Sequence, residues 1–171
     1  MNNLKDISNI NYPLTLKDIK NISKQFGFDI PIVIFPNIKT INGHIIDQII
    51  LYRTKLFSGH WTLLFKNNDG NIEYFDSYGY FPDKALLFNG NALNKKLKME
   101  LPIVNMLLKN IESEYNENDY QSNNSNTCGK WVLIRYLLKY MSNDEFKKLF
   151  WNKNKIFNDD VINQLFIKLL I

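Results

Sequence analysis

The sequence predicts an α+β fold in which a small mixed or antiparallel sheet packs on a buried central helix, flanked by further helices. Segments rich in β-branched and aromatic residues occupy the middle of the chain, and segments with helical hydrophobic spacing occupy its two ends. The chain has 171 residues, of which 45% are hydrophobic and 22% charged. This is the composition of a globular protein, and we expect a single domain over residues 1–171.

The N-terminal half is expected to open with a helix and continue into strands. Thr15 and Asp18 resemble a capping box at the start of a helix over residues 16–26, and Gly27 is a suitable end for it. Strands are expected at residues 30–35, 45–51, 61–65 and 72–75. The last two flank a segment rich in Asn, Asp and Gly, which predicts a hairpin.

The C-terminal half is expected to be mostly helical. Helices are expected at residues 83–88, 102–110, 128–141, 144–151 and 159–170, with a short strand at 115–120. The helix over 128–141 is apolar on most sides, which predicts a buried central helix that begins at Cys128.

Composition excludes several classes of protein. A single cysteine rules out an internal disulfide and a cysteine-rich zinc site, and no glycine-rich phosphate loop is present. We therefore expect no metal. No apolar run approaches the ~20 residues of a membrane span, and the N-terminus lacks the apolar core of a signal peptide. We expect synthesis inside a cell, no secretion through a signal peptide and no membrane partner.

Cys128 is the first candidate for chemistry, because it is expected in the first turn of a helix after a loop dense in N-cap residues. A helix N-terminus favours an anion, and the thiolate is the nucleophilic form of cysteine. Gly129 beside it permits close approach of a substrate backbone. The alternative is a small residue buried in the core.

His60 opens the first hairpin strand and Asp76 closes the second. With the hairpin centred on Asn68 the two residues lie directly opposite each other, with Cβ atoms ~5 Å apart. A one-residue shift of register would put them on opposite faces. In the favourable register Asp76 holds one imidazole nitrogen and leaves the other for a thiol. The alternative is an exposed histidine at the hairpin edge and an unrelated aspartate.

Gln121 precedes Cys128 by seven residues across a polar loop. Its amide can fold back beside the thiolate and donate a hydrogen bond to a developing oxyanion, with the Cys128 backbone N–H as the second donor. The alternative is an ordinary solvated glutamine. His44 is expected at the surface or in a loop, because Asp47 follows it too soon to lie one hairpin away.

The ordered set His60-Trp61, Asp76-Ser77-Tyr78-Gly79, Gln121 and Cys128-Gly129 resembles the adenain-like cysteine protease superfamily. That group includes the adenovirus maturation proteinase, proteases of large DNA viruses and virophages, and SUMO-specific proteases. Its pattern is His-Trp, an acidic residue one hairpin later, and Gln a few residues before Cys-Gly. The expected first helix resembles the family's opening helix, so the resemblance spans nearly the whole chain. Papain-type enzymes place the cysteine first and are disfavoured.

The resemblance implies a cysteine endopeptidase with Cys128 as nucleophile, His60 as base, and Asp76 orienting His60. It implies an oxyanion hole formed by Gln121 and the Cys128 backbone, and substrate contacts near Trp61 and Gly129. Trp61 could equally be a core aromatic. The implied reaction is peptide-bond hydrolysis through a thioester acyl-enzyme, which needs no cofactor.

The resemblance also implies partners and a location. The substrate would be a polypeptide, namely viral capsid or core precursors cleaved during particle maturation, and the enzyme would be a monomer in the virion, the host-cell cytoplasm or a viral factory. DNA or a peptide activator are further partners that the resemblance implies. Because the chain has one cysteine, a disulfide-linked activator would have to use Cys128 itself.

Two other functions stay open. One is a protease or isopeptidase for ubiquitin-like modifiers of the SUMO type, although the chain is short for an additional modifier-binding surface. The other is a non-catalytic nucleic-acid- or capsid-binding protein, suggested by the net charge of +4 and lysine clusters such as the one at residues 95–98. The two arginines argue against base readout through arginine. Lys130, which follows Cys-Gly, is expected to be exposed to solvent.

Overall fold

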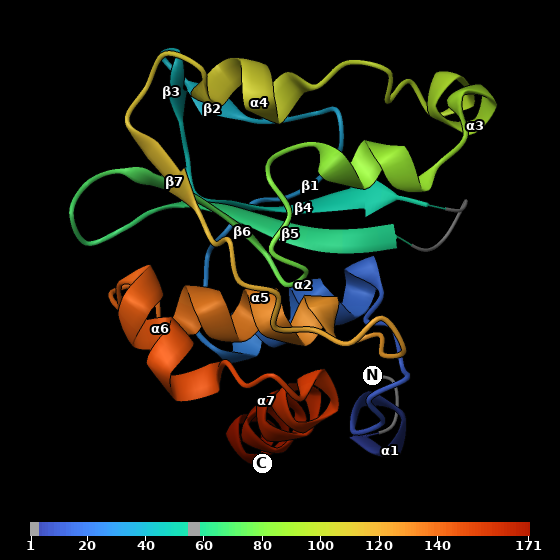
Figure 1. Cartoon of the computed structure of the whole chain (residues 1–171), viewed down its shortest axis with the longest axis vertical. Helices are drawn as coiled ribbons and strands as arrows, with labels where there is room; N and C mark the ends of the chain where they lie inside the picture. The colour runs from blue at the N-terminus through green and yellow to red at the C-terminus, as the bar shows by residue number, and fades with distance from the viewer. Residues whose placement is uncertain (1–3, 55–58) are drawn as a thin grey trace.

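The computed structural model describes residues 4–54 and 59–171. Its centre is a five-stranded sheet in the order β1-β4-β5-β6-β7 (Figure 1). The strands are β1 (Ile32–Ile34), β4 (Gln48–Arg53), β5 (Gly59–Lys66), β6 (Ile72–Asp76) and β7 (Ser113–Tyr115). The outer pairs β1–β4 and β6–β7 are parallel, and the inner pairs are antiparallel. A separate two-stranded sheet joins β2 (Thr40–Ile41) to β3 (His44–Ile45). The predicted α+β class with a mixed sheet is confirmed.

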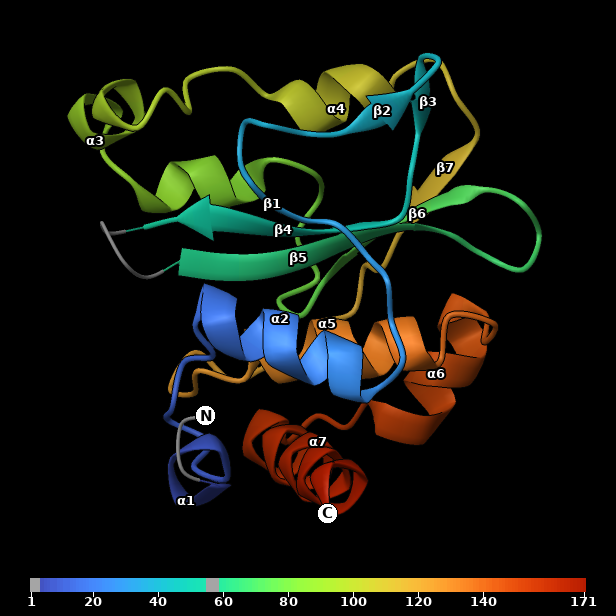
Figure 2. The ribbon, with the colours of Figure 1, turned by 180° about the vertical axis from the view of Figure 1, so that it is seen from behind.

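Helices cover both faces of the sheet (Figures 1 and 2). The elements are α1 (Leu4–Ile7), α2 (Leu16–Gln25), the 3-10 helix η1 (Lys84–Phe88), α3 (Asn91–Lys96), α4 (Ile103–Leu108), α5 (Cys128–Leu137), α6 (Asn143–Phe150) and α7 (Lys155–Leu170). Helices α2 and α5 lie against one face, with α6 and α7 on the same side, whereas η1, α3 and α4 lie on the other side. Each face has its own hydrophobic core. Within residues 4–54 and 59–171, no helix is long and apolar enough to cross a membrane.

Helix α2 begins at the predicted capping box. The Thr15 hydroxyl accepts from the Asp18 N–H, and the Asp18 carboxylate accepts from the Thr15 N–H at 3.0 Å. Ile19 and Ile22 are buried on the inner face of the helix. Gly27 follows with φ of +78°, a conformation that favours glycine, and the helix ends there as expected.

Helix α5 is the buried central helix that the sequence predicts. Its first eight residues are all buried, and it packs against β5 and β6 under the sheet. It ends at Leu137, four residues before the predicted end at 141. The Arg135 guanidinium donates to the carbonyls of Leu138 and Met141, both at 2.9 Å, and so stabilises a turn where the helix was expected to continue.

Three other predicted boundaries were wrong for local reasons. Residues 45–51 do not form one strand, because the Gln48 side chain donates to the carbonyls of Lys39 and Ile46 and the chain turns between β3 and β4. The strand expected at 115–120 was wrong at both ends, because β7 covers Ser113–Tyr115 and shares only Tyr115 with the prediction. Helix α7 begins at Lys155, four residues before the predicted start at 159, because the Asn154 side chain accepts from the Phe157 N–H and caps the helix there.

Candidate active site

His60 and Asp76 meet at the end of the sheet. His60 Nε2 lies 2.9 Å from Asp76 Oδ1, and both side chains are buried. In the observed register Asp76 is paired with Thr62, so His60 is two residues away on the same face. The prediction that His60 and Asp76 lie directly opposite each other was therefore wrong. His60 and Asp76 still meet, because a register shift of two residues leaves both side chains on the same face of the sheet.

The turn of the hairpin explains this register. Lys66 pairs with Ile72, so the loop has five residues and is centred on Asp69, where Asn68 was expected. The Asn67 side chain accepts from the N–H groups of Asp69 and Asn71, and Gly70 has φ of +88°. Asparagine side chains commonly bond to nearby backbone groups in this way, and here they select the longer loop.

Asp76 is held from several directions. Its Oδ1 also accepts from the Tyr78 N–H at 2.8 Å. The Asn116 side chain accepts from the Asp76 N–H at 2.8 Å and donates to the Asp76 carbonyl at 2.6 Å. Asn116 could not be identified from the sequence, because nothing in the spacing of residues 76 and 116 indicates that they meet. Its two bonds pair with the Asp76 backbone beyond the last paired residues of β6 and β7, and so hold the backbone that carries the carboxylate.

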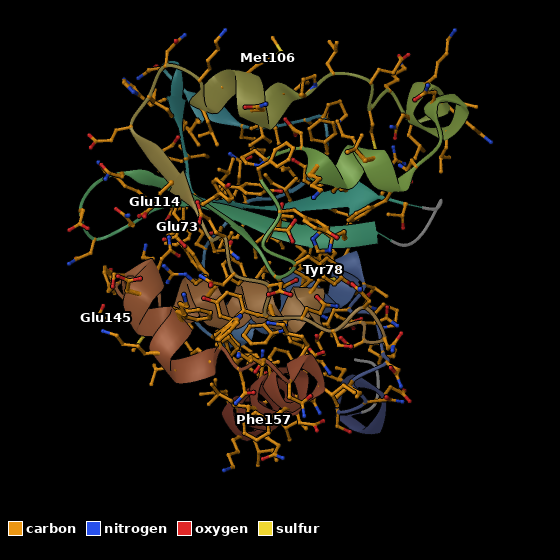
Figure 3. The ribbon with its side chains drawn as sticks, in the orientation of Figure 1. Glu73, Tyr78, Met106, Glu114, Glu145 and Phe157 are labelled. Atoms are coloured by element: carbon orange, nitrogen blue, oxygen red, sulfur yellow. The ribbon has the colours of Figure 1, made fainter. Side chains whose placement is uncertain are left out.

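The environment of His60 favours its protonated form. Burial by itself lowers the pKa of His60, but the charge and hydrogen bond of Asp76, together with the interaction with Cys128, raise it to about 10. Because Nε2 faces Asp76, Nδ1 is the nitrogen left for the thiol. The Tyr78 ring stacks on the imidazole with 5.0 Å between ring centroids. Figure 3 shows Tyr78 between the sheet and α5.

Cys128 is the first residue of α5 and is buried next to His60, with which it interacts. The first N–H groups of a helix have no intrahelical acceptor, and the dipole favours a negative charge there. The structure thus brings Cys128, His60 and Asp76 together. His60 contacts both other residues, which is the arrangement of a nucleophilic thiol, a base and a carboxylate that orients the base.

Gln121 is fixed by two serines. Its Oε1 accepts from the Ser77 hydroxyl at 2.7 Å, and its Nε2 donates to the Ser125 carbonyl at 3.0 Å. The Ser77 carbonyl also accepts from the N–H groups of Tyr120 and Gln121. An amide nitrogen carries two hydrogens, so the bond to Ser125 uses one of them. Gln121 is therefore buried and oriented, contrary to the alternative of a solvated residue.

The two residues expected to contact substrate are packed in the core. Trp61 is 2% exposed and its Nε1 donates to the Leu14 carbonyl at 2.8 Å. It also lines a cavity of about 360 Å³ with Leu14, Leu16 and Leu51. A Cβ at Gly129 would lie only 3.0 Å from the Leu14 side chain, so Gly129 permits close packing of the N-terminal segment. Their contact with substrate stays a prediction.

Three further observations concern the site and its surroundings. A cavity of about 360 Å³ opens beside it, lined by Tyr78, Tyr80, Asp119, Gln121, Ser122, Asn123, Asn124 and Lys155. Among the residues that the structure describes, no group of three or more His, Cys, Asp or Glu side chains could hold a metal ion. His44 is exposed in β3, as predicted.

Lys130 corrects one expectation from the sequence. It is fully buried, where exposure was expected, and its ammonium donates to the Asn9 carbonyl at 2.9 Å and to Asn163 Oδ1 at 2.6 Å. Burial lowers the pKa of Lys130 to about 8, and the nearby charge of Asp159 partly opposes this effect. The lysine thus holds the N-terminal segment and α7 against the start of α5.

Sequence analysis also missed Asp159, which is fully buried in α7 and accepts hydrogen bonds from the loop before Cys128. The sequence contained one indication that Asp159 is buried. Asn158, Asp159 and Asn163 share the buried face of the helix with Ile162 and Phe166. Polar residues on an apolar face are buried only with partners, so their pattern indicates a hydrogen-bonded network.

The fold defines the chain as an α+β protein with a mixed five-stranded sheet. No family model matches it. It is 35% identical over 129 residues to "Uncharacterized protein V9" of the Sputnik virophage, an alignment that covers 68% of this chain and 73% of that protein. The chain belongs to the family of this virophage protein, which indicates a viral origin.

Proposed function

We propose that the protein is a cysteine endopeptidase that cleaves viral structural precursors during particle maturation. The observation that carries the proposal is the buried pair of His60 and Asp76, with 2.9 Å between Nε2 and Oδ1, beside Cys128 at the start of α5. A buried ion pair needs a reason, since burying charges is unfavourable. Activation of an adjacent thiol supplies one, because an imidazolium stabilises a thiolate.

The reaction would proceed through a thioester. The Cys128 thiolate attacks the carbonyl carbon of the scissile peptide bond, and the Gln121 amide and the Cys128 N–H stabilise the resulting oxyanion. His60 gives its proton to the leaving amine as the C–N bond breaks. Water then attacks the thioester, His60 accepts a proton from it, and the C–S bond breaks to release the acid. Asp76 keeps the imidazole oriented in both steps.

The choice of substrate rests on the viral origin of the family. A viral protease that is synthesised at the same time as the structural proteins would meet them in the assembling particle. The cavity beside Gln121 is lined mainly by polar side chains and offers a place for the polypeptide on one side of Cys128. Cleavage of recombinant virophage capsid proteins by wild type, and not by Cys128→Ala, is expected. Cleavage of a SUMO fusion alone would favour a modifier protease.

The direct test uses the single cysteine. An ordinary thiol has a pKa of about 8.5 and reacts slowly with iodoacetamide in acid. We expect rapid alkylation of Cys128 below pH 6 in the wild type and its loss in His60→Ala. The matched control is His44→Ala, which removes the exposed histidine and should change nothing. Equal alkylation of wild type and His60→Ala across the pH range would overturn the proposal.

A further inference from the structure

Asp159 is a fully buried carboxylate in α7 that binds both ends of the loop between Gln121 and Cys128. Its Oδ2 accepts from the Ser122 N–H at 2.9 Å. Its Oδ1 accepts from the Thr127 hydroxyl at 2.5 Å and from the Trp131 indole N–H at 3.1 Å. All these donors are buried. One side chain therefore holds the start of the loop, its end and the first turn of α5.

These contacts reach the two groups of the proposed oxyanion hole. On one side, Ser122 is the residue after Gln121, and its carbonyl accepts from Ser125, whose own carbonyl accepts from the Gln121 amide. On the other side, Thr127 is the residue before Cys128 and the N-cap of α5. The positions of the Gln121 amide and the Cys128 N–H relative to each other are thus set through Asp159.

We propose that Asp159 is a positioning residue that holds the Gln121 amide and the Cys128 N–H at the separation needed to bind an oxyanion. The inference rests on the proposed function. It concerns the oxyanion and not the thiolate, because the contacts of Asp159 run to the loop and the helix start, whereas His60 is held by Asp76.

A carboxylate suits this role better than its amide. Asp159 uses both oxygens as acceptors, and an asparagine offers one oxygen and an NH₂ group. In Asp159→Asn the NH₂ group must face either the Ser122 N–H or the Trp131 indole N–H, neither of which can accept a hydrogen bond, so the contact with the start of the loop or with the first turn of α5 is lost. Asp160 is the neighbouring residue of the same helix and is exposed, so Asp160→Asn is the matched control for the change in charge.

The test compares two reagents that need different parts of the site. Iodoacetamide is displaced directly by the thiolate and forms no oxyanion. With p-nitrophenyl acetate the sulfur attacks the carbonyl carbon, an oxyanion forms, and p-nitrophenolate leaves as the acetyl thioester is made. Asp159→Asn should slow this acylation by about 10- to 100-fold, because displaced oxyanion donors have effects of this order. Alkylation by iodoacetamide should keep its rate and pH profile.

A second pair of variants covers the case in which Asp159→Asn does not fold. Thr127→Val removes one bond to Asp159 at nearly constant volume, and Thr127→Ser keeps the hydroxyl. Acylation should fall in Thr127→Val and be retained in Thr127→Ser, again without a change in alkylation.

The outcomes separate this inference from the proposed function. If wild-type Cys128 reacts with iodoacetamide as an ordinary thiol, the proposed function fails. If wild-type Cys128 is activated but Asp159→Asn and Thr127→Val acylate as fast as Asp160→Asn, the role of Asp159 is refuted. Parallel loss of alkylation and acylation in Thr127→Val, with both retained in Thr127→Ser, would also refute it, because the contact would then support the whole site and not the oxyanion donors in particular. Gln121→Ala should reproduce the split between the two reagents.

Discussion

The ring of Tyr78 stacks on the imidazole of His60, with 5.0 Å between centroids and 28° between ring planes. The backbone N–H of the same tyrosine donates to Asp76 Oδ1, the oxygen that His60 also contacts. Tyr78 is partly exposed, whereas His60 is buried. The tyrosine ring therefore covers one face of the imidazole and separates it from solvent.

Removal of this ring should lower the pKa of His60. Burial lowers that pKa, but the charge and hydrogen bond of Asp76 and the interaction with Cys128 raise it to about 10. In Tyr78→Ala the ring–cation contact is lost and water weakens the attraction to Asp76, so the pKa should move back towards 6.5 by roughly one unit. Tyr78→Phe keeps the ring and should have little effect. NMR titration of the His60 ring protons measures the change, with the exposed His44 as internal reference. An unchanged pKa in Tyr78→Ala would show that the ring does not shield the pair.

Asp76→Asn should remove a pH-dependent part of the stability. The pKa of His60 is higher in the folded protein than the 6.5 of an unfolded chain, so its stabilisation is complete below about pH 6.5 and is lost as the pH rises towards about 10. The variant should lose about 2 kcal/mol at pH 6, the usual contribution of a hydrogen bond to a charged group, and much less near pH 10.

Urea denaturation of both proteins at several pH values checks this prediction. The difference between wild type and Asp76→Asn is the relevant quantity, because the titration of Lys130, whose pKa is lowered to about 8, is common to both and cancels. A difference that grows with pH would contradict the assignment of the ion pair.

The buried pair of Arg135 and Glu73 should matter far more for stability than the partly exposed pair of Lys139 and Asp47. Arg135 binds the Glu73 carboxylate with two bonds, at 3.0 and 2.7 Å, and both side chains are fully buried. Arg135→Met leaves the carboxylate unpaired, which should destabilise the protein by about 3–5 kcal/mol. Lys139→Met should change stability by less than about 1 kcal/mol. Chemical denaturation measures both, and similar values for the two variants would refute the distinction.

Gly79→Ala should be more destabilising than Gly27→Ala, although both glycines have positive φ. A Cβ at Gly79 would lie 2.8–2.9 Å from backbone atoms of residues 117–119, the segment that leads to Gln121, whereas a Cβ at Gly27 meets nothing within 4 Å. We expect a loss of about 1 kcal/mol for Gly27→Ala from backbone strain and about 3 kcal/mol for Gly79→Ala from strain and overlap. Urea denaturation provides the comparison, and equal losses would mean that residues 117–119 move aside freely.

Local patterns in the sequence predicted most of the larger elements and much of the site, but not α1, β2 or α3. The apolar periodicity of the helix after Cys128 predicted its burial, and the capping box at Thr15 predicted the start of α2. The turn signals between residues 65 and 72 predicted the hairpin that brings His60 and Asp76 to one face. These features depend on residues close in sequence, whose relative directions follow from the repeat of a strand or helix.

Contacts between segments far apart in the sequence could not be predicted from these local patterns. One local feature could not be predicted either: the loop centre at Asp69 depended on which of several asparagine side chains bonds to the backbone, and spacing does not decide that. Asn116 beside Asp76, Ser77 beside Gln121, and Asp159 beneath the loop are each joined across more than 30 residues. Their positions follow from the packing of whole elements.

The sequence by itself therefore determined most of the elements and the single thiol at a helix start, and it predicted the shared face of His60 and Asp76 in one of the two registers considered. The structure showed which bonds of the Asn67 side chain set the hairpin register, and the packing of distant elements decided the burial of Lys130 and the placement of Asp159 under the loop. The physical reason is that the repeat of a strand or helix fixes which way a side chain points, whereas its partner depends on how separate elements pack.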